Sequence, residues 1–217
     1  MASPSVRWGL AAAALSVAGA VGWGIVAGGD YATRQSAERS FVLDENFTVV
    51  RKILVRKDAA KQIVAMGGDS EFVEQNWTAV GGEIESLQIL DPAWRLELHG
   101  QLTVRTLDDY VGREVIVLDQ DVEITVDRVN SEVRLSRGAE RLADYAMTTR
   151  FSRTPAETTQ VELTLAQQIR TDAPWFAHRI ADRRVLAAVE RSLANQERAI
   201  RQLVADHRDD VPLLPLR

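Results

Sequence analysis

Apolar and polar residues alternate along most of the chain from residue 94 to residue 169, which is the pattern of strands with one buried face. One apolar set consists of Trp94, Leu96, Leu98, Leu102 and Val104. Similar sets follow at 115–126, 133–135, 145–151 and 161–169, separated by short turns rich in Asp, Asn, Gly or Pro. Long alternating strands joined by short turns predict an antiparallel meander with one dry and one wet face.

The spacing becomes helical after residue 172. Pro174 suits a first helical turn, and Asp172 is a candidate cap. Apolar residues then recur every three or four positions, at Ile180, Leu186, Val189, Leu193, Ile200 and Leu203. We expect one long C-terminal helix that lies on the dry face of the sheet, with its many arginines on a solvated face.

The segment before the meander is less regular. Residues 41–55 place Phe47, Val49, Ile53 and Val55 on one face, which predicts a strand. A helix follows, with Asp58 as its cap and Gly67-Gly68 at its end. Residues 69–77 predict a second short helix or turn.

Residues 8–29 contain no charge, and Trp8 and Trp23 lie towards the two ends of this stretch. At about 1.5 Å per residue the stretch can cross a hydrocarbon core of about 30 Å. It is either an uncleaved signal anchor or a signal peptide cleaved after Ala18-Gly19-Ala20. Apolar sequence continues to Ala27 and favours the anchor. We expect the following domain to be extracytoplasmic, or secreted if cleavage occurs.

These observations divide the chain into four parts. We expect a signal anchor or signal peptide at 1–29, a linker at 30–40, one domain at 41–207 and a tail at 208–217.

Composition narrows the chemistry. The net charge of −5, with acids and bases interspersed, leaves no basic footprint for nucleic acid, and the absence of cysteine excludes disulfides and thiolate chemistry. His99, His178 and His207 have no neighbour at metal-ligand spacing, so we expect no metal and no cofactor. Asp119, Asp121 and Glu123 align on one outer face, which indicates a solvated surface.

The order of elements (a strand, short helices, a curved meander and a long final helix) resembles the START-like superfamily, also called SRPBCC. The stretch FSRTPAETTQVELTL at 151–165, which leads into the last helix, is similar to the final hairpin of that family. The usual small residue and Pro before the first helix are replaced here by Arg56-Lys57-Asp58. The resemblance implies an α+β helix-grip fold, in which a curved antiparallel sheet wraps around the long helix. It also implies a pocket for a lipid, sterol, quinone or polyketide.

Polar residues interrupt the apolar faces at Arg51, Gln120 and Gln167, and less markedly at Thr149. A buried unpaired amide costs about 1–3 kcal/mol, so such residues persist when they find partners or line a wet cavity. The alternative is a β-bulge that turns each of them into solvent. Aromatic candidates for the cavity wall are Trp94, Tyr145, Phe151, Trp175 and Phe176.

Three functions remain open. The first is a membrane-tethered, non-catalytic carrier or sensor of a hydrophobic or amphipathic small molecule. The second is a cyclase- or hydrolase-like enzyme that uses a polar residue in the same cavity. The third is a membrane-anchored domain that binds only other proteins.

Overall fold

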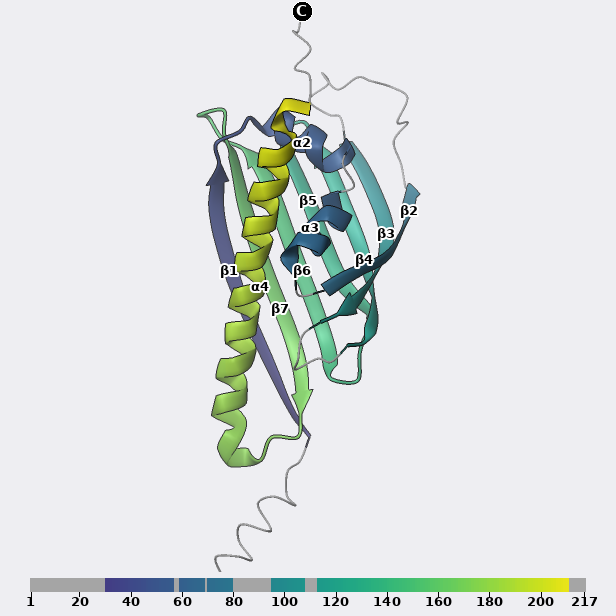
Figure 1. Ribbon diagram of the computed structural model, residues 1–217, viewed down its shortest axis with the longest axis vertical. Helices are drawn as coiled ribbons and strands as arrows, with labels where there is room; N and C mark the ends of the chain where they lie inside the picture. The colour runs from purple at the N-terminus through teal and green to yellow at the C-terminus, as the bar shows by residue number, and fades with distance from the viewer. Residues whose placement is uncertain (1–29, 57–58, 69, 80–94, 108–112, 211–217) are drawn as a thin grey trace, which may run out of the picture.

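The computed structural model describes residues 30–56, 59–68, 70–79, 95–107 and 113–210. Within these residues, seven strands form one curved antiparallel sheet, with a long helix and two short helices in front of it (Figure 1). The elements are β1 (Tyr31–Leu43), α2 (Phe47–Arg56), α3 (Ala59–Gly67), β2 (Ser70–Ala79), β3 (Arg95–Thr106), β4 (Val115–Thr125), β5 (Arg128–Arg137), β6 (Leu142–Arg153), β7 (Thr159–Thr171), η1 (Trp175–Ala177), α4 (His178–His207) and η2 (Arg208–Asp210).

The sheet has the strand order β1-β7-β6-β5-β4-β3-β2. Strands β2 to β7 follow one another as a meander, and β1 joins the other edge by pairing with β7 from Tyr31↔Thr171 to Leu43↔Thr159. The predicted meander and the predicted long C-terminal helix are both confirmed. None of the helices in the described ranges is long and apolar enough to cross a membrane. The predicted anchor at 8–29 lies outside the described residues.

The predictions for residues 30–55 were wrong in three respects. Residues 31–43 form β1, so the segment 30–40 is not a linker. Most of the predicted strand at 41–55 is helix α2, because Phe47, Val50 and Ile53 recur at helical spacing and are all fully buried. Val55, assigned to the apolar face, is 58% exposed.

The start of α2 shows why the chain turns helical there. Asn46 acts as a cap: its Oδ1 accepts a hydrogen bond from the Thr48 N–H at 2.8 Å, and its carbonyl accepts one from the Val50 N–H at 3.1 Å.

Residues 70–79 form strand β2 rather than the predicted short helix or turn. Helix α3 ends as predicted, with Gly68 at a φ of 77°, a conformation that favours glycine.

Helix α4 supplies the centre of the hydrophobic core. Its buried residues are Val185, Val189, Leu193, Ala199, Ile200, Leu203 and Val204. Val185 belongs to a cluster with Leu142 and Ile169. The others pack with apolar residues of β1, β7 and α2, including Phe41, Phe47 and Leu163. The predicted stripe therefore holds from Val189 onward, whereas Ile180 is exposed.

No side chain caps either η1 or α4, so the predicted cap at Asp172 is not formed. Of the predicted tail, 208–210 form η2 and the remainder lies outside the described residues.

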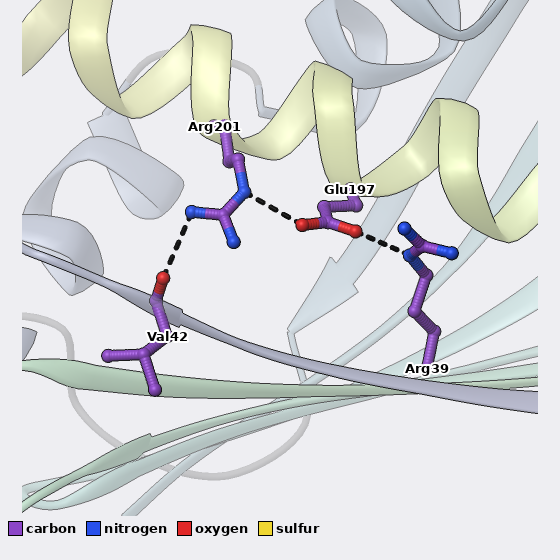
Figure 2. Close-up of polar contacts among 4 residues, drawn as sticks. All are labelled: Arg39, Val42, Glu197 and Arg201. Atoms are coloured by element: carbon purple, nitrogen blue, oxygen red, sulfur yellow. Dashed lines mark hydrogen bonds and ion pairs between the residues drawn. The ribbon is translucent and has the colours of Figure 1, made fainter.

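An ion-pair network fastens α4 to the edge strand β1 (Figure 2). The Glu197 carboxylate on α4 accepts hydrogen bonds from the guanidinium groups of Arg39 on β1 and Arg201 on α4, the latter at 2.8 Å. Arg201 also donates to the Val42 carbonyl at 3.0 Å and lies 4.7 Å from the centre of the Phe41 ring. Burial alone raises the pKa of the Glu197 carboxyl. The hydrogen bonds and charges of the two arginines more than offset this effect, so its pKa is lowered.

This network predicts a pH-dependent contribution to stability. The pKa of Glu197 is lower in the folded than in the unfolded chain, so the network stabilises the fold above the ordinary Glu pKa of about 4.3. That contribution is lost as the pH falls through the folded-state pKa. Glu197→Gln should therefore lower the free energy of unfolding by roughly 1 kcal/mol near neutral pH. The difference in the free energy of unfolding between this variant and the wild type should shrink in acid. Urea unfolding of both proteins, near neutral pH and below the folded-state pKa of Glu197, measures that difference.

Glu190→Gln is the matched control, because Glu190 is an exposed carboxylate on the same helix without a described ion pair. Equal effects of the two substitutions would show that the network does not fasten α4 to β1.

Candidate functional site

A cavity of about 360 Å³ lies between the sheet and the helices. Helix α4 packs on β1 and β7, at one side of the sheet, and α3 packs between α4 and β2, at the other. The side chains of β3 to β6 that face the helices form the floor of the cavity, and residues of α2, α3 and α4 form its roof. Its position follows from one long helix covering only part of a seven-stranded sheet.

Most of the wall is apolar. The alternation read from the sequence directs Leu102 and Val104 of β3 and Ile116, Leu118 and Ile124 of β4 inward, where all five are buried and line the cavity. Helices α2 and α3 contribute further aliphatic side chains. Such a wall favours an apolar ligand over water, because transfer of apolar surface from water into it is favourable.

A polar relay crosses the floor. Gln120 on β4 is 7% exposed, and its amide is satisfied on both sides. Its Oε1 accepts a hydrogen bond from Gln75 Nε2 of β2 at 2.9 Å, and its Nε2 donates to Ser131 Oγ of β5 at 3.2 Å. All three residues line the cavity, and Thr149 on β6 also lines it and pairs with Ser131 in the sheet. The Gln120 amide therefore points into the cavity and has partners, which agrees with the interpretation that it is a satisfied buried amide rather than one turned into solvent by a β-bulge.

A second polar position lies on the last strand. Gln167 lines the cavity and pairs with Tyr145 on β6 and with Gln35 on β1. Pairing between β7 and β1 continues through Gln167 without a shift, so no bulge on that side turns it outward. Among the described residues, the Gln167 side chain has no hydrogen-bond partner. Its amide is therefore available to a bound molecule or to water.

No described residue lining the cavity carries a formal charge. The polar members are amides and hydroxyls, namely Ser70, Gln75, Thr106, Gln120, Ser131, Tyr145, Thr149, Gln167, Ser192, Asn195 and Gln196. Tyr145 is the one member of the described lining, apart from serine and threonine hydroxyls, that has an acidic proton. An ionised ligand group in this cavity would lie in low dielectric without a counter-charge from the described lining, which costs several kcal/mol.

Of the predicted wall residues, Gln120, Tyr145, Thr149, Phe151 and Gln167 line the cavity. Phe151 is buried in its apolar part. The Tyr145 hydroxyl lies 3.6 Å from the sulfur of Met147, which also lines it. Trp94 lies outside the described residues.

Arg51 is buried as predicted, but it is not part of the cavity lining. It lies on helix α2, and its guanidinium donates to the carbonyls of Thr125 at 3.0 Å and Val126 at 3.3 Å. Burial lowers the pKa of the Arg51 guanidinium, and the positive charge of Arg153 lowers it further. The side chain therefore joins α2 to the end of β4 and serves the fold.

Trp175 and Phe176 are also outside the cavity. Both belong to η1 ahead of α4, and they are 74% and 60% exposed. The prediction was wrong because both residues precede the buried part of α4, which begins at Val185.

Several lining residues escaped the sequence analysis. On α4 the missed residues are Ser192 and, three and four positions later, Asn195 and Gln196, beside the apolar stripe. Polar residues with this spacing lie on one face of a helix, and their position at the border of a buried face could have indicated the cavity. Trp77 escaped because its segment was not predicted as a strand. It is 45% exposed and, with the exposed Val55 of α2, marks where the cavity opens to solvent.

Gly100 makes room for Trp77. It is the β3 residue that pairs with both Trp77 on β2 and Gln120 on β4. A Cβ atom at this position would lie 2.7 Å from Cε3 of the Trp77 ring and 2.7 Å from the Asn76 carbonyl oxygen. The glycine therefore allows the indole to lie over β3 at the opening.

The remaining candidates lie away from the cavity. His99 contacts Asp121 on the exposed outer face of the sheet, and Asp119 and Asp121 are exposed there too. Within the described residues, no three His, Asp or Glu side chains are grouped so that they could hold a metal ion.

No protein-family model and no curated protein matches this chain in sequence. Solved structures do match in fold. The Zhui aromatase/cyclase from a Streptomyces species aligns over 81% of this chain and 96% of its own, with 16% identity and a TM-score of 0.50. A protein of unknown function from Staphylococcus aureus aligns over 82% and 98%, with 10% identity and a TM-score of 0.52. The chain has the START-like, helix-grip fold. At these identities the likeness establishes the fold alone.

The two cavity amides predict opposite effects on stability. Gln120→Leu removes the central amide with both of its hydrogen bonds and leaves Gln75 and Ser131 without that partner, so the free energy of unfolding should fall by roughly 1 kcal/mol or more. Gln167→Leu orphans no described group, so stability should stay level or rise slightly. Thermal and urea unfolding of the two variants measure the contrast. A loss of stability in Gln167→Leu equal to that in Gln120→Leu would contradict the unpartnered amide at 167.

Proposed function

We propose that this protein binds and carries a neutral, hydrophobic or amphipathic small molecule in the cavity of its helix-grip domain. The observation that carries the proposal is the cavity itself, with an apolar wall, a few fixed amides and hydroxyls, and no formal charge among its described lining residues. Its volume of about 360 Å³ lies within the ordinary range for small-molecule sites, roughly 300–1,000 Å³.

The polar positions suggest how such a ligand is oriented. Gln120 is held by two partners and keeps the relay rigid, whereas the amide of Gln167 and the hydroxyl of Thr149 have no described hydrogen-bond partner. A ligand with one hydroxyl or carbonyl group gains hydrogen bonds there while its apolar body contacts the aliphatic wall. Lipid alcohols, sterols, quinones and neutral polyketides fit this description, whereas free fatty acids do not.

The enzymatic alternative has less support from the site. A cyclase- or hydrolase-like reaction needs a general acid or base within reach of the ligand. The described lining contains no Asp, Glu, His, Lys or Arg, and it offers the Tyr145 phenol, which is a weak acid. The interaction-domain alternative expects a filled interior, whereas this chain maintains a cavity with a built polar lining. Both observations favour a binding role.

We also propose that residues 8–29 tether the domain to a membrane, with the domain on the extracytoplasmic side. The support is the uncharged 22-residue run with tryptophans towards its ends. A mature soluble protein that begins at Val21 would contradict the tether and favour cleavage.

The neutral lining predicts discrimination between an alcohol and an acid. A long-chain alcohol and the matching carboxylic acid, each with a photoreactive diazirine, are offered to the full chain in nanodiscs. The alcohol should half-saturate labelling at a concentration at least about tenfold lower near neutral pH, equivalent to about 1.4 kcal/mol. The difference between the two half-saturating concentrations should narrow at a pH at which the acid is protonated. Mass spectrometry of the labelled peptides measures the labelling by each ligand.

Two alanines on α4 provide a matched pair of variants. Ala188 lines the cavity, so Ala188→Trp fills it and should abolish labelling, whereas Ala187 is exposed and Ala187→Trp should not. Stronger labelling by the acid, or labelling that survives Ala188→Trp, would overturn the proposal.

A further inference from the structure

Three large apolar side chains are exposed together where α4 begins. Trp175 is 74% exposed, Phe176 60% and Ile180 54%. The Trp175 and Phe176 rings meet edge to face with centroids 5.9 Å apart, and Ile180 follows Phe176 by one helical turn. Single exposed apolar residues are ordinary, but apolar side chains gathered in this way are typical of an interaction surface. We call these three residues the tip patch.

The tip patch stands on a well-packed frame. The Tyr31 ring, at the start of β1, stacks on the His178 ring with centroids 3.6 Å apart and planes 5° from parallel. The Tyr31 hydroxyl donates to Asp182 Oδ1 at 2.7 Å, one turn further along α4. The Ala177 N–H donates to the Pro174 carbonyl at 2.8 Å and closes the turn that holds Trp175 and Phe176. The patch is therefore a built feature of the domain.

Positive charge borders the patch. Arg179, Arg183 and Arg184 are exposed on the first turns of α4, and none of the three has an ion-pair partner among the described residues. Aromatic and aliphatic side chains at a tip, with arginines one turn behind, match the two layers of a bilayer surface, acyl chains below and headgroups above. Each such arginine near an anionic surface contributes favourably.

The first described residue of the chain lies at the same end of the domain as the tip patch. β1 begins at the end of the molecule where α4 begins (Figure 1), and its first residue, Tyr31, contacts α4 directly. Only residue 30 separates the uncharged run from β1. If the run lies in a bilayer, which is the tether proposed above and on which this inference rests, the tip patch cannot be far from the bilayer surface.

We propose that the tip patch inserts into the interfacial layer of an anionic bilayer and holds the domain upright on it, with α4 pointing away from the membrane. The patch then supplies a second point of attachment beside the tether and prevents the domain from rotating freely.

The absence of cysteine makes a direct test clean. Single cysteines at Phe176→Cys and Ile180→Cys carry a spin label in the full chain, reconstituted in vesicles of phosphatidylcholine with phosphatidylglycerol. Gln202→Cys, exposed near the other end of α4, is the control. Flotation with the vesicles is measured first, and accessibility of each label to oxygen and to a water-soluble nickel complex second. Melting temperatures confirm that each variant is folded.

We expect flotation, with labels at 176 and 180 gaining access to oxygen and losing access to nickel relative to 202. Arg183→Glu with Arg184→Glu should reduce that contrast. Flotation with nickel-accessible labels at 176 and 180 would overturn the inference and leave the tether intact. Labels shielded from both reagents would show that protein covers the patch, by residues 8–29 or a second copy, and would also overturn it. Failure to float would overturn the tether and the inference together.

Discussion

The packing of one long helix against one side of a seven-stranded sheet is the constraint on which the rest of the structure depends. α4 buries Val189, Leu193, Ile200 and Leu203 against β1, β7 and α2, and the Arg39–Glu197–Arg201 network fixes it to β1. A helix is about 10 Å wide and a sheet gains about 4.8 Å per strand, so one helix covers only part of a sheet this wide. The remaining concave surface is roofed by short helices that do not fill it. A cavity follows from that geometry.

The lining of the cavity then determines what it can hold. Its aliphatic wall makes it unfavourable for water, and its amides and hydroxyls provide orientation without charge. The relay from Gln75 through Gln120 to Ser131 satisfies its central amide, so the floor is rigid before any ligand arrives. Gly100 leaves room for the Trp77 ring at the opening. The selectivity for neutral ligands that we propose and the preformed shape of the site both rest on these residues.

The sequence predicted the meander and the final helix because strict alternation and three- to four-residue spacing persist for dozens of residues there. Gln120 and Gln167 were visible as polar residues in apolar rows, and their strands keep them facing inward. The N-terminal half was harder. Phe47, Val49, Ile53 and Val55 fit a two-residue period, but the same segment also holds Phe47, Val50 and Ile53 at helical spacing. The Asn46 cap favours the helix. β1 pairs with β7, more than a hundred residues away, and that pairing leaves no local signal.

Native mass spectrometry of the full chain, extracted in mild detergent from the cells in which it is made, tests the central claim most directly. The account predicts a species heavier than the bare chain by one neutral, apolar molecule of constant mass. That species should be absent from a variant with the cavity filled at Ala188. Only the bare chain in both samples, or an added mass that proves to be an anionic lipid, would contradict a cavity built for a neutral ligand.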